Sequence, residues 1–155
     1  MLNMKKLYGL FVAVVIIALD LLTKNWVSSS LIMYESIEII PNFFWITYVV
    51  NSGAAWSMFS QFTWILTLIS IVATIGLTYV YITKEHHLLV MIGLVLMIAG
   101  TFGNLVDRFF YGGVRDFLSF NIFGYMWPVF NLADMSLVIG VGFILLDMVV
   151  HPDAS

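Results

Sequence analysis

Cysteine is absent from the 155-residue chain, and charged residues are scarce. Without cysteine the chain can form no disulfide, hold no metal through thiolates and use no cysteine nucleophile. Charged residues make up 10% of the sequence, against roughly 25% in an ordinary soluble domain. The six lysines and arginines are scattered along the chain, so the sequence offers no basic patch and we expect no nucleic-acid partner.

Apolar residues take the place of the missing charges. They make up 62% of the chain, against roughly 45–50% in a soluble domain, and the mean hydropathy is +1.04. Small domains bury only part of their chain, so a soluble fold of this size would expose much of this apolar surface to water. The composition therefore excludes most soluble classes, as well as coiled coil and intrinsic disorder, and it indicates an integral membrane protein.

Four apolar stretches are long enough to cross a bilayer, which requires about 20 residues of helix. They comprise residues 7–26, 62–83, 88–106 and 131–150. The first follows two lysines but lacks a cleavage site of small residues, so we interpret it as a retained helix rather than a signal peptide. The sequence thus predicts an all-α membrane protein, in which residues 1–155 form one domain with four transmembrane helices.

The connections between these spans differ greatly in length. Residues 84–87 form a short turn, whereas residues 27–61 and 107–130 form two long connections. In an up-and-down bundle the long connections lie on one side, so one face of the protein is built up and the opposite face is thin. Lys5 and Lys6 precede the first helix and favour an orientation with both termini inside. The built-up face is then the outer, extracytoplasmic face.

Tryptophan and strand-forming residues gather on the built-up face. The five tryptophans fall there or at helix ends that reach it: Trp26, Trp45, Trp56, Trp64 and Trp127. Tryptophan prefers the headgroup level of a bilayer, so an ordinary aromatic belt also explains them. Residues 43–50 are rich in β-forming side chains and precede the turn signal Asn51-Ser52-Gly53. We therefore expect a small β-rich layer on the outer face.

Carboxylates also concentrate at the built-up face. Four of them map there: Asp20, Asp107, Asp116 and Asp134. A carboxylate at mid-bilayer costs about 2.5–3.5 kcal/mol, so acidic residues in such segments are candidates for function. Two carboxylates that meet can share one proton, because two close like charges do not both ionise easily. For Asp116, solvation in a loop remains the simpler alternative. Asp147 maps to the thin face, where we expect a structural role.

Two pairs of polar residues share helix faces near these carboxylates. Asn104 and Arg108 are four residues apart, and Asn131 and Asp134 are three apart. Asn and Arg side chains can donate hydrogen bonds to peptide carbonyls or to a carboxylate. Simpler roles are equally open, because Arg108 could pair with an acidic neighbour and Asn131 could cap the fourth helix.

Competing chemistries have little support in the sequence. The three histidines, His86, His87 and His151, map to the thin face, away from the other polar groups. The chain lacks a His-Glu-x-x-His zinc motif and a phosphate-binding glycine-rich loop. A Ser–Lys dyad would have to bring Ser57 to Lys24, and no motif supports that pairing.

Five short motifs carry a resemblance to a known family. They are Asp20-Leu-Leu-Thr-Lys24, Asn51-Ser-Gly-Ala-Ala-Trp56, Gly103-Asn-Leu-Val-Asp-Arg108, Val114-Arg-Asp-Phe117 and Asn131-Leu-Ala-Asp134. In order and spacing the chain resembles bacterial lipoprotein signal peptidase (signal peptidase II) over nearly its whole length. The acidic tail after the fourth span differs from the basic tails often found in that family.

The resemblance implies an aspartic endopeptidase of the bacterial cytoplasmic membrane. It implies cleavage of diacylglyceryl-modified prolipoproteins immediately before the lipidated cysteine, with Asp116 and Asp134 as the catalytic dyad. Five positions match the substrate or inhibitor pocket: Asn51, Gly53, Asn104, Arg108 and Asn131. Three further residues are expected to be structural or to shape the pocket: Asp20, Lys24 and Asp107.

The resemblance also sets expectations for ligands and mechanism. The inhibitor globomycin is expected to bind between the two aspartates, and no metal or organic cofactor is implied. We expect a monomer among membrane lipids that activates one water by general acid–base catalysis, without a covalent intermediate. Two other classes rank lower. A small transporter would use Asp20 as its coupling carboxylate, and a non-catalytic scaffold would need neither Asp116 nor Asp134.

Overall fold

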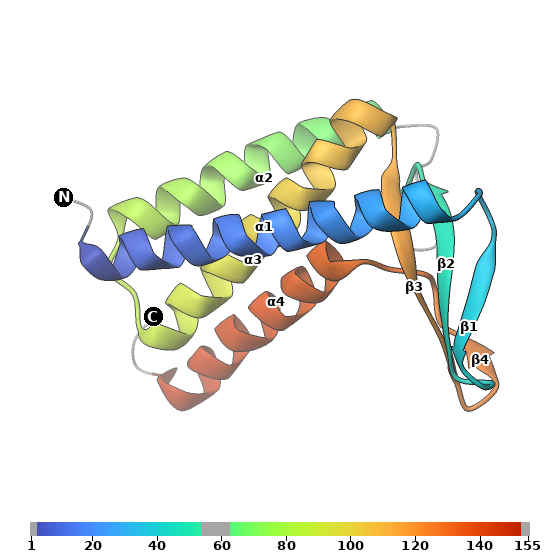
Figure 1. Ribbon diagram of the computed structural model, residues 1–155. Helices are drawn as coiled ribbons and strands as arrows, with labels where there is room; N and C mark the ends of the chain where they lie inside the picture. The colour runs from blue at the N-terminus through green and yellow to red at the C-terminus, as the bar shows by residue number, and fades with distance from the viewer. Residues whose placement is uncertain (1–2, 54–62, 153–155) are drawn as a thin grey trace.

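The computed structural model describes residues 3–53 and 63–152, so Trp56 and Ser57 lie outside the described residues. Within this part, four helices form a bundle and four strands form a sheet at one of its ends (Figure 1). The helices are α1 (Met4–Ser30), α2 (Thr63–Thr83), α3 (Leu88–Tyr111) and α4 (Leu132–Val150). The strands are β1 (Ser36–Ile40), β2 (Phe44–Asn51), β3 (Val114–Ile122) and β4 (Tyr125–Met126). The predicted helical bundle with a small β-rich layer is therefore confirmed.

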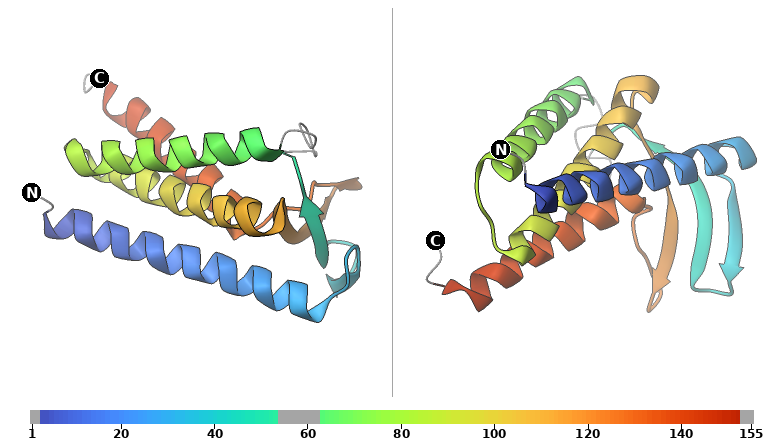
Figure 2. Two further views of the ribbon diagram at one scale, coloured as in Figure 1. Left: turned by 90° about the horizontal axis from the view of Figure 1, so that it is seen from above. Right: turned by 60° about the vertical axis from the view of Figure 1, so that its left-hand side comes forward.

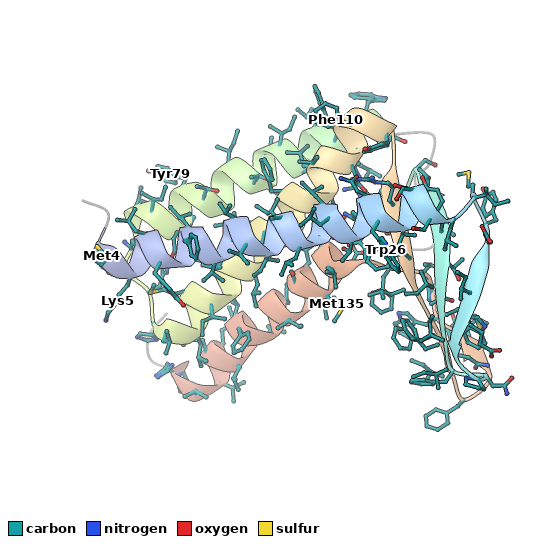
Figure 3. All side chains as sticks on the ribbon, viewed as in Figure 1. Met4, Lys5, Trp26, Tyr79, Phe110 and Met135 are labelled. Carbon is teal, nitrogen blue, oxygen red and sulfur yellow. The ribbon has the colours of Figure 1, made fainter. Side chains whose placement is uncertain are left out.

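All four helices are long and apolar enough to cross a membrane. Figure 3 shows large apolar side chains pointing outward along the bundle, including Tyr79 and Phe110, which are both exposed. An outward apolar surface of this kind suits lipid rather than water, because lipid tails need no hydrogen bonds from the protein.

Helix α3 is the central helix and packs against the other three helices. Its contact with α4 depends on small residues. A side-chain carbon at Gly93 would lie 2.7 Å from the carbonyl oxygen of Gly140, and one at Gly100 would collide with the carbonyl oxygen of Ala133. Small residues let helix backbones approach closely within a membrane. The polar residues of α3 and α4 are thereby held side by side.

Helix α3 extends beyond the predicted end of the third span at residue 106. Asp107 and Arg108 consequently lie in its last turns rather than in the connection. The helix ends at Gly112, whose φ of 67° is the left-handed conformation that glycine adopts without strain. The chain then turns directly into β3, which brings Asp116 back beside the end of the bundle (Figure 1).

The sheet is antiparallel with strand order β1-β2-β3-β4. Strand β3 contacts both α1 and α3 and is buried from Val114 to Phe117. In the pairing of β2 with β3, Asn51 lies opposite Val114 and Val49 opposite Asp116. Figure 2 shows the sheet closing one end of the bundle, while the start of α1 and the end of α4 lie at the other end.

The tryptophans of the described residues lie at the sheet end of the molecule. Trp26 lies near the end of α1 (Figure 3), and Trp64 lies in the first turn of α2. Trp45 belongs to β2, and Trp127 directly follows β4. The amphipathic rings are thus placed where one membrane boundary would meet the protein.

Lys6 has a role at the opposite end that the sequence analysis did not anticipate. Its side chain is buried, and Nζ donates hydrogen bonds to the carbonyl oxygens of Ile82 and Lys84 at 3.1 and 2.8 Å. It also pairs with Glu85 at 3.0 Å. Lys6 therefore closes the end of α2, because the last carbonyls of a helix lack partners within it.

Candidate active site

Asp116 is a buried carboxylate held by two amide groups. It lies in β3 and is only 3% exposed. Oδ1 accepts a hydrogen bond of 2.6 Å from Asn131 Nδ2, and Oδ2 accepts one of 3.3 Å from Asn51 Nδ2. Asn51 is the last residue of β2, and its own Oδ1 accepts from the backbone N–H of Gly53 at 3.0 Å. The predicted turn signal thus fixes the amide that contacts Asp116.

Asp134 lies in the first turn of α4 and forms a capping box with Asn131. Asn131 Oδ1 accepts from the N–H of Asp134 at 2.9 Å, and Asp134 Oδ2 accepts from the N–H of Asn131 at 3.3 Å. The other oxygen, Oδ1, accepts a hydrogen bond of 2.7 Å from Asn104 Nδ2. The helix terminus also favours a negative charge at this position.

Asn131 connects the two carboxylates. Its backbone N–H donates to Asp134, and its side-chain amide donates to Asp116. Helix capping and contact with the carboxylates are alternatives for Asn131 on the sequence alone, whereas in the structure this residue makes both sets of contacts. Asp116 and Asp134 are 18 residues apart in the sequence, and both carboxylates accept hydrogen bonds from this one residue.

The surroundings raise the pKa of Asp116 from 3.8 to about 7. Burial is the main cause, because it removes the water that would stabilise the charged form. The negative charge of Asp134 raises the pKa further, while the hydrogen bonds from Asn131 and Asn51 and the charge of Lys24 oppose the shift. One carboxyl group of the pair is thereby able to hold a proton near neutral pH.

Both carboxylates line a cavity of about 760 Å³. Four other predicted pocket residues line it as well: Asn51, Gly53, Asn104 and Arg108. The remaining wall is mostly apolar and comes from α2, from residues 127–130 and from the first turns of α4. This combination of an apolar wall with a few convergent polar groups is typical of a ligand site.

Arg108 brings a positive charge to the same cavity. Its guanidinium nitrogens lie 3.5 Å from Ser70 Oγ and 3.5 Å from the carbonyl oxygen of Gly53, which are long hydrogen bonds. Its buried Nε has no hydrogen-bond partner within residues 3–53 and 63–152. Arg108 thus keeps donor capacity for a bound group, whereas the alternative of a close ion pair with an acidic neighbour does not occur among the described residues.

A second buried cluster of charges lies beside the carboxylate pair. Lys24 Nζ lies 2.7 Å from Asp20 Oδ2 and 3.5 Å from Asp107 Oδ2. Arg115 contacts Asp107 through its side chain at 2.7 Å and through its backbone N–H at 2.8 Å. Asp20 also accepts from the backbone N–H of Ala133 at 3.0 Å. This charge network of Asp20, Lys24, Asp107 and Arg115 links α1, α3, β3 and the start of α4.

The charge network meets the carboxylate pair at Asn104. Lys24 Nζ donates to Asn104 Oδ1 at 3.0 Å, and Asn131 Nδ2 donates to the same oxygen at 3.2 Å. The two donors fix the orientation of the Asn104 side-chain amide, because its oxygen has to face them. Its Nδ2 is therefore directed toward Asp134. Lys24 therefore positions a group that contacts the carboxylate pair.

Several residues at this end were missed or left without a role by the sequence analysis. Arg115 stood within a quoted motif, and its charge in so apolar a chain was a usable signal. Asn25, whose Oδ1 accepts from Arg115 at 2.6 Å, and Ser70, which faces the cavity, gave no sequence signal. Asp20, the carboxylate that a transporter would use, is committed to Lys24 and Ala133.

Comparisons with known proteins identify the family of this chain. A family model described as signal peptidase (SPase) II matches residues 12–150. A lipoprotein signal peptidase of Staphylococcus haemolyticus (strain JCSC1435) is 41% identical over 148 residues, which covers 92% of this chain and 94% of that protein. A lipoprotein signal peptidase of Staphylococcus aureus (strain JH9) is 37% identical over 139 residues, covering 89% of this chain and 85% of that protein.

Solved structures give the same result. A bacterial membrane enzyme determined by the in meso method at 2.3 Å resolution is 35% identical, with a TM-score of 0.87, covering 94% of this chain and 90% of that one. A second, determined by the same method at 1.9 Å, is 37% identical with a TM-score of 0.82, covering 91% and 92%. The identities and coverage, together with the match of the family model over most of the sequence, show that this chain belongs to the signal peptidase II family of membrane peptidases.

Proposed function

We propose that this chain removes signal peptides from diacylglyceryl-modified prolipoproteins, cutting immediately before the lipidated cysteine, as an aspartic peptidase. The observation that carries the proposal is the pair Asp116 and Asp134, joined by Asn131 at the wall of a cavity of about 760 Å³. The lipoprotein signal peptidases among its relatives support the substrate class. Two carboxyl groups that share a proton supply both a base and an acid.

The reaction uses one water and the shared proton. At neutral pH Asp116 can hold the shared proton, because its pKa is raised to about 7, and Asp134 acts as the base. Asp134 accepts a proton from the water as its oxygen bonds to the scissile carbonyl carbon. Asp116 then gives its proton to the leaving nitrogen as the C–N bond breaks. The pair ends with one proton, now on Asp134, and transfer of that proton to Asp116 restores the starting state.

Neighbouring polar groups hold the substrate for this step. Arg108 and the amide of Asn51 line the cavity beside the carboxylates and can donate to peptide carbonyls. Asn104 keeps Asp134 in a fixed orientation through its 2.7 Å hydrogen bond. An inhibitor of the globomycin type would occupy the same space between the carboxylates.

The apolar part of the cavity suits a substrate that comes from the bilayer. Ile69 of α2 and Val138 of α4 line it, and both are well exposed on the lipid-facing surface. A signal peptide and the acyl chains of the lipidated cysteine that follows it can therefore reach the carboxylates without crossing water. We place the enzyme in the bacterial cytoplasmic membrane as a monomer, with both termini inside and the sheet at the outer leaflet.

A cleavage assay on the purified full-length chain tests this proposal. A diacylglyceryl-modified prolipoprotein is incubated with wild type, Asp116→Asn and Asp134→Asn, and the product masses are determined. We expect wild type alone to cut, immediately before the lipidated cysteine, and to leave an unlipidated prolipoprotein largely uncut. Cleavage by either variant at the wild-type rate would refute the assigned roles, and a covalent acyl-enzyme on either aspartate would refute the mechanism.

A further inference from the structure

A group of three metal-binding residues lies at the end of the bundle away from the sheet. His87 precedes the first residue of α3, and Asp147 and His151 lie at the end of α4. His87 Nδ1 lies 3.4 Å from Asp147 Oδ2, and His151 Nδ1 lies 2.9 Å from Asp147 Oδ1. The two imidazole rings are 4.4 Å apart between centroids. The loop between α2 and α3 and the end of α4 thus present their ligand atoms to one point.

The spacing of these atoms suits a small divalent cation. One ligand atom from each residue lies within 4.8 Å of the other two. Zinc binds imidazole nitrogen at about 2.0–2.1 Å and carboxylate oxygen at about 2.0–2.2 Å, so two ligands of a tetrahedral site are roughly 3.4 Å apart. The observed separations, 3.4 Å from His87 Nδ1 to Asp147 Oδ2 and 2.9 Å from His151 Nδ1 to Asp147 Oδ1, fall near that value.

The chemistry of the group also favours zinc. Two imidazoles with one carboxylate form a common ligand set for zinc, whereas calcium and magnesium prefer oxygen ligands alone. Asp147 is largely buried, while the side chains of His87 and His151 are 47% and 42% exposed. The open side leaves room for a water as the fourth ligand. Asp147 and His151 are four residues apart, a spacing that places both on one helix face.

The neighbouring histidine provides an internal contrast. His86 Nε2 lies 3.0 Å from the carbonyl oxygen of Val80 and does not belong to the group of three. His86 and His87 are adjacent in sequence but contact different helices: His86 contacts the end of α2, and His87 faces α4. This contrast supplies a matched control for any test of metal binding.

We propose that His87, Asp147 and His151 form a zinc site that joins the start of α3 to the end of α4. The site is distinct from the carboxylate pair, which lies at the sheet end of the same helices (Figure 1). The ion stabilises the folded chain, because it binds ligands that come together only when these helices pack. It takes no part in the cleavage of the signal peptide.

The test is a zinc titration of the full-length chain, purified without a polyhistidine tag and stripped with chelator. Isothermal titration with Zn²⁺ is compared between wild type, His87→Ala, His151→Ala and the control His86→Ala. We expect one Zn²⁺ per wild-type chain and at least tenfold weaker binding in His87→Ala and His151→Ala. His86→Ala is expected to bind as wild type does. Asp147→Asn serves as a further ligand variant should either alanine variant fail to fold.

A second readout separates this site from binding elsewhere. Zn²⁺ should raise the melting temperature of wild type and of His86→Ala, and leave His87→Ala and His151→Ala unchanged. Binding by all four proteins with equal affinity would overturn the proposal, as would no binding by wild type. Signal-peptide cleavage should be the same with and without chelator, which distinguishes the zinc site from the proposed active site.

Discussion

Two buried polar clusters lie side by side at the sheet end, and they differ in how their charges are balanced. The charge network contains two carboxylates and two cations in contact, Asp20 with Lys24 and Asp107 with Arg115. The carboxylate pair, Asp116 and Asp134, is held instead by the neutral amides of asparagines. Burial without a cation in contact raises the pKa of Asp116 to about 7, so this carboxyl group can take up a proton near neutral pH.

This difference in charge balance suits the charge network to a structural role and the carboxylate pair to proton transfer. Buried ions with close partners resist separation, so the charge network can fix the positions of α1, α3 and β3. The carboxylate pair keeps two like charges near each other beside a cavity, an arrangement that opposes folding but favours proton transfer. Asn104 lies between the two clusters, because it accepts a hydrogen bond from Lys24 and donates one to Asp134, so the charge network can hold the carboxylate pair in position.

Removing one charge from the network gives the largest expected change in stability. Asp107→Asn leaves Arg115 buried without its carboxylate, and breaking a buried ion pair costs about 3–5 kcal/mol. We therefore expect a much lower melting temperature in detergent. Glu38→Gln, an exposed carboxylate of β1, is the control and should change stability by less than about 0.5 kcal/mol. Equal effects of the two substitutions would contradict the structural role of the network.

Substitution of the connecting asparagine should have an intermediate effect on activity. In Asn131→Ser the hydroxyl can still cap α4, but the side chain is too short to keep the 2.6 Å contact with Asp116. We expect the rate of cleavage to fall roughly tenfold, in line with the loss of one hydrogen bond that positions Asp116, with a small change in melting temperature. Wild-type activity in this variant would show that Asn131 serves only as a helix cap.

The pH dependence of cleavage should report the proton on Asp116. Its pKa in the folded chain is about 7, so the carboxyl group is protonated below that value and ionised above it. The rate should therefore fall as the pH rises through about 7, because the acid for the leaving nitrogen is lost. In Asn131→Ser the fall should move to higher pH, since a hydrogen bond that stabilises the ionised form is gone. A cleavage rate that does not change up to pH 9 would contradict this assignment.

Much of the fold could be predicted from the sequence because membrane helices depend on local composition. Runs of apolar residues identified the four spans, and the unequal connections placed the sheet at one end. The end of α3 was placed too early, since Asp107 and Arg108 look like residues of a loop when their partners are unknown. The buried position of Asp107 depends on Arg115, which reaches it only after the chain has turned at Gly112.

The candidate site could be predicted only in part from local composition. Carboxylates and asparagines at span boundaries are costly enough to attract attention, and the motif resemblance supplied their roles as predictions. The contacts between segments could not be read from the sequence. Tertiary packing determines the two sets of contacts that Asn131 makes and the meeting of His87 with His151. It also determines that Arg108 Nε has no hydrogen-bond partner within the part of the chain that the structure describes.

One measurement tests the contrast between the two clusters most directly, namely the melting temperature and the activity of Asp116→Asn at pH 8. Ionisation of Asp116 opposes folding above pH 7, because its pKa rises from 3.8 in the unfolded chain to about 7 in the folded one. The unfolded chain releases the proton first, so stability falls between about pH 4 and 7, by at most roughly 4 kcal/mol. A neutral Asn removes this penalty and can still accept from Asn131. The account predicts no detectable cleavage with a melting temperature at or above that of wild type, whereas retained cleavage, or a loss of stability like that of Asp107→Asn, would contradict it.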